Sequence, residues 1–296
     1  MPKSLKIYIF LLVLIFIGII WADATKERPI DWRESYSLNE KIPFGLYVFN
    51  QEHKAIFKPQ TVEKFSESPY EFLDKNYNTY DSIYDIEGTI LLIQNKAAID
   101  EFSENELFYF ASHRNAIFYS NSNFSQKFAD SLGFEIEYSN DFADSLQFKI
   151  NRNQKAGNFY FNKGINTAYF SKIDSSKTEV LGTQINSKGE EFANFIKVKH
   201  LNGNFYLHLQ PVAFTNYYLL NKNSQYTEDI LGYIPSKSPI YWKVKQYDNE
   251  ELSSSPMRYL LSQPALKWAW FLAWISLIIF MIFNAKRRQR VIPIKE

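Results

Sequence analysis

The order of apolar and polar positions divides the middle of the chain into short, alternating elements. Residues 89–94 (TILLIQ) and 116–119 (AIFY) are continuous apolar runs, the pattern of strands that are buried on both faces. A capping-box pair, Ser103 and Glu106, lies between the two runs and predicts a helix start there. Because helices and strands alternate at short spacing, the sequence predicts an α/β fold with a doubly wound, mainly parallel, Rossmann-like sheet.

The next elements continue this alternation. The helix FSQKFADSL is expected to be capped by Ser122 or Asn123 and to end at Gly133, before a third strand, FEIEY. Further strands are expected at residues 146–150, 158–161, 168–170, 179–183, 194–200 and 204–210. The last two flank Leu201-Asn202-Gly203, where Asn-Gly tolerates positive φ and favours a β-hairpin. We therefore expect one α/β domain over residues 42–235, with an added hairpin.

Two long apolar segments lie outside this domain. Residues 7–21 carry no charge, and with their neighbours they make residues 1–22 just long enough to span a bilayer, which takes roughly 20 residues. A cleaved signal peptide is the alternative, because Ala22-Asp23-Ala24 places small residues two apart. Residues 265–285 contain three tryptophans and precede a basic cluster, so a transmembrane helix is expected there too.

The flanking charges give these segments an orientation. Basic residues follow the second segment and precede the first, so the positive-inside rule places both chain ends in the cytoplasm. The sequence thus predicts a two-pass protein of the bacterial inner (cytoplasmic) membrane with a periplasmic main domain. Residues 23–41 are then a tether, residues 236–264 a return segment to the membrane, and residues 286–296 a basic cytoplasmic tail.

Charge and cysteine content exclude several classes of function. The net charge is only +1, and because basic residues gather at the ends, the middle of the chain is acidic. An acidic domain lacks the basic face that nucleic-acid binding requires. The chain has no cysteine, which excludes a disulfide framework, a zinc–thiolate site and a cysteine nucleophile.

The carboxyl ends of the predicted strands carry polar residues but no catalytic motif. The sequence lacks G-x-G-x-x-G, a P-loop, an acidic metal cluster and a G-x-S-x-G nucleophile elbow, and no two of its four histidines share the i, i+4 spacing of a helical metal pair. We therefore expect no metal, no cofactor and no enzymatic activity. A hydrolase couple of Ser120 or Ser122 with His208 is the alternative.

Binding residues are expected at these same strand ends, because ligands of open α/β sheets lie beyond the carboxyl ends of the strands. His208 alternates with apolar residues and shares a strand face with Gln210, so a structural corner and a recognition site both fit it. The binding candidates are His208, Gln210, Asn121, Asn123 and Asn216.

Three stretches carry a resemblance to a known family: IPFGLYVF, FYLHLQPVAFTNYYLL and SSPMRYLLSQPALKWAW with FNAKRRQR after it. They resemble the bacterial membrane proteins labelled domain of unknown function 4350, along essentially the whole chain. The resemblance implies a fold like that of class I glutamine amidotransferases and of ABC-transporter auxiliary domains. A glutamine amidotransferase needs a cysteine nucleophile, so the resemblance implies a non-catalytic relative.

The resemblance also implies partners. In this family the genes lie next to genes for MoxR-type AAA ATPases and von Willebrand factor A-like proteins, which suggests a complex at the membrane. The function expected from the sequence is therefore that of a membrane-anchored binding or scaffold protein. An auxiliary subunit of an ABC-type transporter and an envelope hydrolase are the alternatives.

Overall fold

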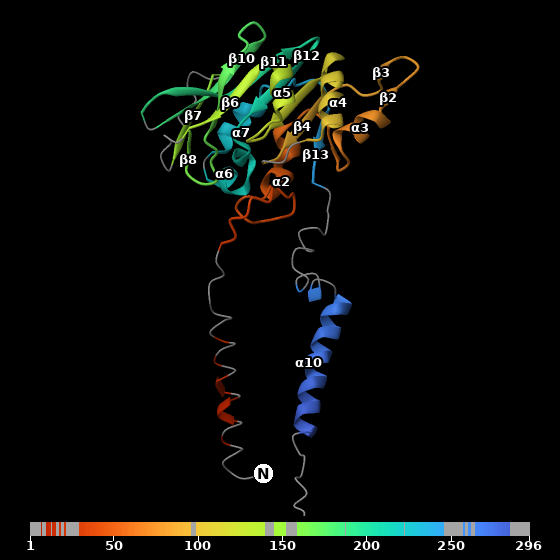
Figure 1. Ribbon diagram of the computed structural model, residues 1–296, viewed down its shortest axis with the longest axis vertical. Helices are drawn as coiled ribbons and strands as arrows, with labels where there is room; N and C mark the ends of the chain where they lie inside the picture. Colours follow the sequence, from red (N-terminus) through yellow and green to blue (C-terminus); the bar gives the residue numbers. More distant parts are fainter. Residues whose placement is uncertain are drawn as a thin grey trace, which may run out of the picture. The chain divides into compact units, whose positions relative to one another are not determined.

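The computed structural model describes residues 30–245 except 96–98, 140–144, 152–158, 187 and 222, together with residues 264–284 and isolated positions within 7–21 and 257–261. The chain divides into two units, residues 1–245 and residues 246–296. The first unit contains the main sheet and the helices packed on it, and the second contains the helix α10 (Pro264–Asn284) (Figure 1).

Helix α10 coincides with residues 265–285, so the helix expected there is confirmed. Among the described positions, however, no helix combines the length and the apolar character that a membrane crossing requires. The transmembrane crossing predicted at 265–285 is thus not found among these positions, whereas the segment predicted at 1–22 falls mostly on residues that the structure does not describe. Most of residues 1–29 and the whole of the predicted tail 286–296 lie outside the described residues.

Five strands of the main sheet run parallel to one another. In sheet order they are β1 (Val62–Phe65), β13 (Ile240–Lys243), β4 (Thr89–Ile93), β5 (Ala116–Ser120) and β12 (Gly203–His208). Every residue of β4 and β5 is buried, as expected for parallel strands covered on both faces. The two continuous apolar runs are thus confirmed as strands, whereas β13 lies where the sequence predicts only a return segment.

The remaining strands pair in the antiparallel sense. They are β11 (Glu191–His200), β10 (Thr178–Ile185), β7 (Leu146–Ile150) and β8 (Phe159–Phe161), with β9 (Ala168–Ile173) bridging β11 and β6 (Phe134–Tyr138). The predicted mainly parallel, doubly wound sheet is therefore wrong, because the eleven-stranded sheet of the described residues is mixed. A short turn, such as the one between β11 and β12, joins neighbouring strands in the antiparallel sense. An apolar run indicates that a strand is buried, but it does not indicate the direction in which the strand runs.

Helices cover both faces of the parallel half (Figure 1). Ile90 and Leu92 of β4 belong to one hydrophobic cluster, and Leu91 and Ile93 belong to the other, because successive side chains of a strand point to opposite faces. The first cluster packs under α3 (Pro69–Lys75), α4 (Glu101–Ser112) and α5 (Gln126–Leu132). The second packs under α2 (Tyr47–Ile56), the 3₁₀ helix η1 (Pro211–Phe214), α6 (Asn216–Leu220) and α7 (Ser224–Leu231).

Two helices begin at residues other than the expected caps. The side chain of Asp100 accepts the Ser103 N–H, so α4 starts one turn before the predicted capping box. Ser125, rather than Ser122 or Asn123, caps α5 by accepting the Phe128 N–H. Gly133 ends α5 in the left-handed conformation with φ 72°, as the sequence predicts.

The β11–β12 hairpin is confirmed, but for a different local reason. Leu201, not the Asn-Gly pair, carries the positive φ of 50° in the turn. Gly203 is required by close approach instead, since a Cβ there would lie 2.1 Å from the Ala111 carbonyl oxygen and 2.3 Å from that of Asn115. The hairpin therefore packs closely against the C-terminal end of α4.

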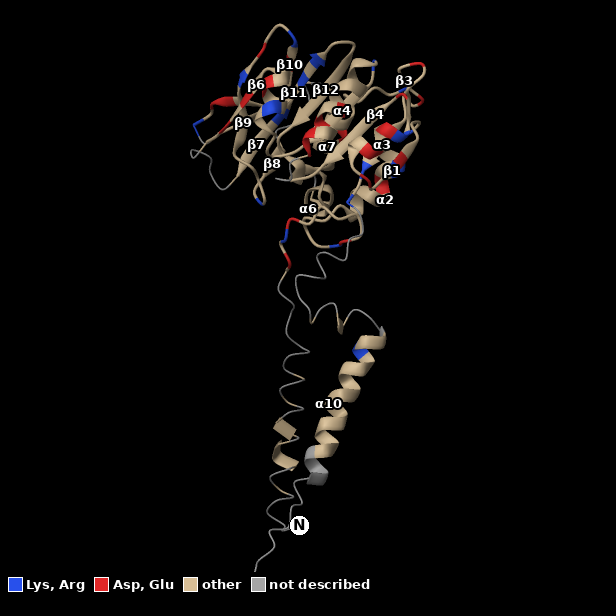
Figure 2. Ribbon diagram, turned by 45° about the vertical axis from the view of Figure 1, so that its right-hand side comes forward, with Lys and Arg blue, Asp and Glu red and all other residues tan. Residues whose placement is uncertain are grey.

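Charged side chains of both signs are interspersed over the first unit (Figure 2). Several of them face each other across neighbouring strands, as in the ion pairs Lys172–Glu135 at 2.9 Å and Lys197–Glu179 at 3.9 Å. These side chains are largely exposed, so each pair is expected to contribute under about 1 kcal/mol to stability.

Candidate functional site

The position where an open α/β sheet holds ligands falls between β5 and β12. After β5 the chain enters α5 on one face of the sheet, and after β12 it enters η1 and α6 on the other face. Neighbouring parallel strands whose connections leave in opposite directions open a crevice at their carboxyl ends. The residues predicted for binding include His208, Gln210, Asn121 and Asn123, which follow or end these two strands. We call the place where the two strands end the switch point.

Strand register brings the predicted hydrolase couple into contact. Ser120 and His208 are partners across the parallel β5–β12 pair, and Ser120 Oγ lies 2.9 Å from His208 Nδ1. His208 Nε2 lies 3.1 Å from Tyr226 Oη of α7, and Asn194 Nδ2 donates to the same Tyr226 oxygen at 3.2 Å. All four side chains are essentially inaccessible to solvent.

One proton arrangement satisfies the contacts of the couple. If Tyr226 Oη accepts from Asn194 and donates to His208 Nε2, then His208 Nδ1 donates to Ser120 Oγ. A serine nucleophile needs the reverse arrangement, with the histidine accepting the serine proton. Burial lowers the pKa of His208 to about 3 and raises that of Tyr226, so the imidazole is neutral. The couple lies in a fully buried network, so a substrate cannot reach Ser120 in this structure.

The crevice itself is filled by the chain's own residues. The segment before β9 inserts Asn166, whose backbone N–H donates to Gln210 Oε1 at 3.0 Å and whose Nδ2 donates to the Ser122 carbonyl at 3.1 Å. Gln210 Nε2 in turn donates to the Asn166 carbonyl and, at 3.4 Å, to Gln184 Oε1. We call Asn166, Gln210 and Ser122 the plug. It occupies the place that a ligand would take in an open sheet of this kind.

The other predicted binding residues have structural roles or stand apart. Asn121 is buried and donates to Tyr119 Oη at 2.9 Å. Asn216 accepts the Val48 N–H at 2.7 Å in the first turn of α2, and it donates to the Glu40 and Ile42 carbonyls. Asn123 alone among the five is exposed. The five candidates therefore do not form one open site.

An open region lies on the same edge of the sheet, at the ends of β4 and β13. Two adjacent cavities, of about 100 Å³ and about 270 Å³, share Leu92, Gln94 and Lys243 in their linings. The smaller is also lined by Glu34, Tyr36 and Lys245, and the larger by Ser68 and Asp100. We call this pair the carboxyl-edge cavities. The sequence analysis missed them because it did not recognise β13, although the run IYWK after Pro239 was the available signal.

Lys243 lies between the two cavities. Its Nζ donates to the Ser66 carbonyl at 2.7 Å and to the Val244 carbonyl at 2.9 Å, and within the described part of the chain it has no ion-pair partner. Burial lowers the pKa of Lys243, while the more distant carboxylates of Glu67 and Glu71 act in the opposite direction. Both carboxylate oxygens of Asp100, which lines the larger cavity, are engaged by Ser103 in capping α4.

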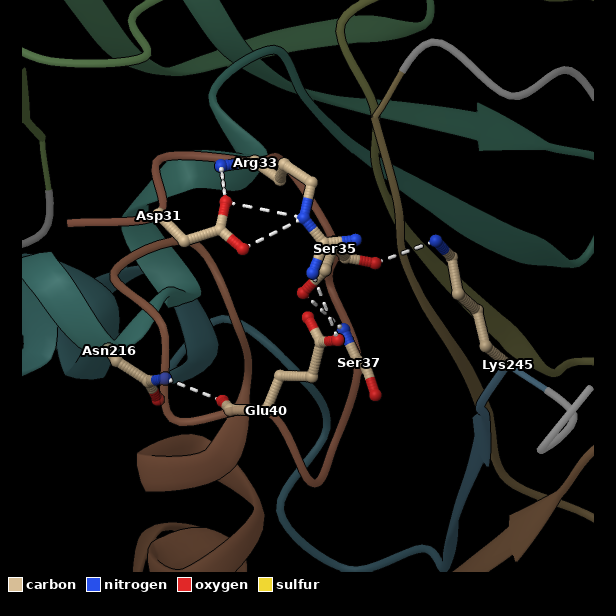
Figure 3. A network of polar contacts seen from close by, with 7 residues as sticks. All are labelled: Asp31, Arg33, Ser35, Ser37, Glu40, Asn216 and Lys245. Atoms are coloured by element: carbon tan, nitrogen blue, oxygen red, sulfur yellow. Dashed lines mark hydrogen bonds and ion pairs between the residues drawn. The ribbon is translucent and has the colours of Figure 1, made fainter. Parts of the chain in front are cut away.

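An extended segment covers the smaller cavity. Residues 30–46, which we call the strap, are held by Lys245 Nζ, which donates to the Ser35 carbonyl at 2.6 Å, and by Asn216, which donates to the Glu40 carbonyl at 2.9 Å (Figure 3). Arg33 pairs with Asp31 at 2.9 Å and with Glu40 at 3.5 Å. Tyr36 is buried, takes a positive φ of 49° and forms a wall of the cavity.

A further cavity, of about 560 Å³, lies between α2 and α7. Its floor is mainly apolar, and its rim carries Glu52, Lys58 and Glu228. It has no half-buried charge of the kind that Lys243 contributes at the strand ends. No group of three or more histidine or carboxylate side chains that could hold a metal ion occurs among the residues the structure describes.

Comparison with known proteins gives no family. No family model matches the chain, and no curated protein matches it. Similar solved structures include an exo-β-1,4-mannosidase from Opitutaceae bacterium strain TAV5, with TM-score 0.39 and 10% identity over 65% of this chain and 39% of that chain. A catalytic mutant of a GH42 β-galactosidase from G. stearothermophilus gives TM-score 0.30 and 12% identity over 46% and 21% of the two chains. A β-galactosidase from Bacillus circulans sp. alkalophilus gives 0.27 and 11% over 48% and 22%.

Two predictions are corrected. The mixed sheet contradicts the mainly parallel, amidotransferase-like fold that was expected. The similar structures are glycosidases by their titles, so the expectation that the chain is not an enzyme is withdrawn. The chain spans 39% or less of the length of these structures, and at such low TM-scores they assign it neither a reaction nor a substrate.

Proposed function

We propose that the first unit binds a small ligand carrying a carboxylate or phosphate group in the carboxyl-edge cavities. The observation that carries this proposal is Lys243, a half-buried ammonium group that lines both cavities and contacts only carbonyl oxygens among the described residues. Buried charges in proteins are ordinarily paired, because an ion loses its hydration on burial. A ligand oxyanion would supply the missing charge.

The geometry leaves room for that contact. Lysine Nζ has three donors, and two of them are used by the Ser66 and Val244 carbonyls. The third is available to a ligand oxygen. Neighbouring side chains add polar groups that can fix a ligand's orientation, since Gln94 lines both cavities and Ser68 lines the larger one. Such a mixture of an apolar lining with a few convergent polar groups is typical of small-molecule sites.

The test is calorimetric titration of the whole chain with inorganic phosphate and with succinate. Lys243→Met keeps the length of the side chain and removes its charge, so we expect it to weaken binding of the preferred probe at least about tenfold. Lys64→Met is the matched control, because Lys64 lies on neighbouring β1 and is also desolvated but lines neither of the carboxyl-edge cavities. Equal affinity in wild type and Lys243→Met, or no binding of either anion, would refute the proposal.

Hydrolysis stays the alternative function, and the contact between Ser120 and His208 is the observation that bears on it. Because that couple is fully buried, a hydrolase built on this chain would use other groups. A screen with chromogenic esters and glycosides separates the two cases. Activity that survives Ser120→Ala places the reaction elsewhere, whereas activity that Ser120→Ala abolishes without loss of stability places it at the couple.

The exported location and the partnership with MoxR-type AAA ATPases and von Willebrand factor A-like proteins stay predictions from the sequence. Co-purification of the tagged chain after mild solubilisation of cells tests the partnership. Recovery of the chain without such proteins under several conditions would count against the partnership, and it would leave ligand binding at Lys243 untouched.

A further inference from the structure

Another cavity, of about 350 Å³, lies at the opposite edge of the sheet, at the amino ends of the parallel strands. Three parts of the chain border it: the hairpin of β2 (Tyr77–Asn78) and β3 (Ile83–Tyr84), the C-terminal end of α4, and the β11–β12 turn. Its lining residues are Ile83, Tyr84, Ile86, Glu87, Ser112, His113, Arg114, Asn115 and Asn202. We call it the amino-edge cavity.

Hydrogen bonds fix the walls of this cavity. His113 bridges α4 and the hairpin, with Nδ1 2.9 Å from the Tyr109 carbonyl and Nε2 3.3 Å from the Ser82 carbonyl. Asn115 Oδ1 accepts the Gly88 N–H at 2.7 Å, and Asn202 Nδ2 donates to the Ser112 carbonyl at 3.1 Å. Because the walls are held in place without a ligand, binding would require little ordering of the protein.

Two opposite charges line the amino-edge cavity without engaging each other. Arg114 and Glu87 are both exposed, and within the described residues neither makes an ion pair or a hydrogen bond. Arg114 stands just beyond the end of α4 with φ 68°, a conformation that is unfavourable for a residue with a Cβ. The apolar part of the lining is formed by Ile83, Ile86 and Tyr84, beside the polar side chains of Ser112, Asn115 and Asn202.

We infer that the amino-edge cavity binds a free α-amino acid with an apolar side chain. An α-amino acid carries a carboxylate and an ammonium group one carbon apart, which matches an unpaired guanidinium and an unpaired carboxylate lining one cavity. The planar guanidinium of Arg114 can hold a carboxylate through two parallel hydrogen bonds, and Glu87 can accept from the ammonium group. The ligand's side chain would then lie against Ile83 and Ile86.

Calorimetric titration of the whole chain with L-leucine tests this inference. Leucinamide lacks the carboxylate and 4-methylpentanoate lacks the ammonium group, so each should bind about tenfold or more weakly than leucine. Arg114→Gln should weaken leucine but leave leucinamide unchanged. Glu87→Gln should weaken leucine but leave 4-methylpentanoate unchanged. This double pattern identifies which charge meets which group of the ligand.

Controls separate this site from the carboxyl-edge cavities. Glu179→Gln and Lys197→Gln remove an exposed pair of the same charges elsewhere on the sheet, and Lys243→Met removes the other proposed site, so all three should bind leucine as the wild type does. The inference is overturned if leucine, isoleucine, methionine and phenylalanine all fail to bind the wild type. It is also overturned if leucine, leucinamide and 4-methylpentanoate bind equally well, or if Arg114→Gln and Glu87→Gln leave leucine binding intact.

Discussion

The switch point between β5 and β12 and the ends of β4 and β13 lie on the same edge of the same parallel strands, yet they differ in what fills them. At the switch point, Asn166 and Gln210 satisfy each other and His208 is sealed beneath Tyr226. At β4 and β13, the space stays open under the strap, and Lys243 has no ion-pair partner among the described residues. Topology therefore marks an edge where a site can form, but the loops that reach that edge decide where the site stays open.

The largest expected effect tests whether the switch point is structural. His208→Ala removes a fully buried side chain and leaves Ser120 and Tyr226 without their partner, so we expect a loss of about 4 kcal/mol in the free energy of unfolding. Urea unfolding measures it. Asn123→Ala, at an exposed position of the same edge, is the control and should change stability by less than about 0.5 kcal/mol. A stable His208→Ala protein would show that the network is dispensable.

Acid pH should lower the free energy of unfolding through the same histidine. The folded state holds His208 neutral with a pKa of about 3, whereas the unfolded chain takes up the proton near the ordinary value of 6.5. The unfolded state therefore binds more protons in this window, and stability falls as the pH drops from about 7 toward 3. Between pH 6.5 and pH 4 this residue should account for about 3 kcal/mol.

Unfolding curves of wild type and His208→Gln at several pH values isolate this contribution. Glutamine cannot titrate, so the variant is expected to lose less stability on acidification than the wild type. Parallel pH profiles for the two proteins would mean that His208 has the same pKa in the folded and the unfolded state, and the sealed network would then be wrong.

The smallest expected effect concerns the strap over the open cavity. Lys245→Met removes the hydrogen bond to the Ser35 carbonyl at the surface, so it should lower stability by less than about 1 kcal/mol. Hydrogen exchange should quicken at the amides of Tyr36 and Leu46, whose acceptors lie within the strap, and stay unchanged at Leu207 in β12. Lys199→Met, at an exposed position of β11, should leave all three amides unchanged. Faster exchange at Leu207 would show that strap and sheet open together.

Much of the fold could be predicted from local pattern. The apolar runs of β4 and β5, the left-handed Gly133 and the hairpin before Gly203 each carry their signal within a few residues. Strand direction did not, because β6 follows a helix as a parallel strand would but pairs antiparallel with β9. The pairing partner of a strand depends on loops and on tertiary packing, so it cannot be deduced from the residues of the strand alone.

The candidate site shows the same limit more strongly. His208 and Gln210 were correctly placed at a carboxyl edge, but their partners, Tyr226 and Asn166, come from distant segments with no sequence motif. Lys243 escaped notice because a four-residue strand between Pro239 and a polar stretch resembles a loop. Polar residues at strand ends can be listed from sequence, whereas whether they face a ligand or one another follows only from the assembled fold.

Asn166 has a consequence for how the first unit unfolds. It belongs to the connection between β8 and β9 in the antiparallel half, and its bonds end on Gln210 and Ser122, which follow β12 and β5 of the parallel half. Tyr218 of α6 fastens the same connection by binding the backbone of Asn162 and Lys163. These hydrogen bonds, together with the β11–β12 pairing, join the two halves without a covalent bond, so each half loses native hydrogen bonds when the other melts. A label in either half should report a single, shared transition.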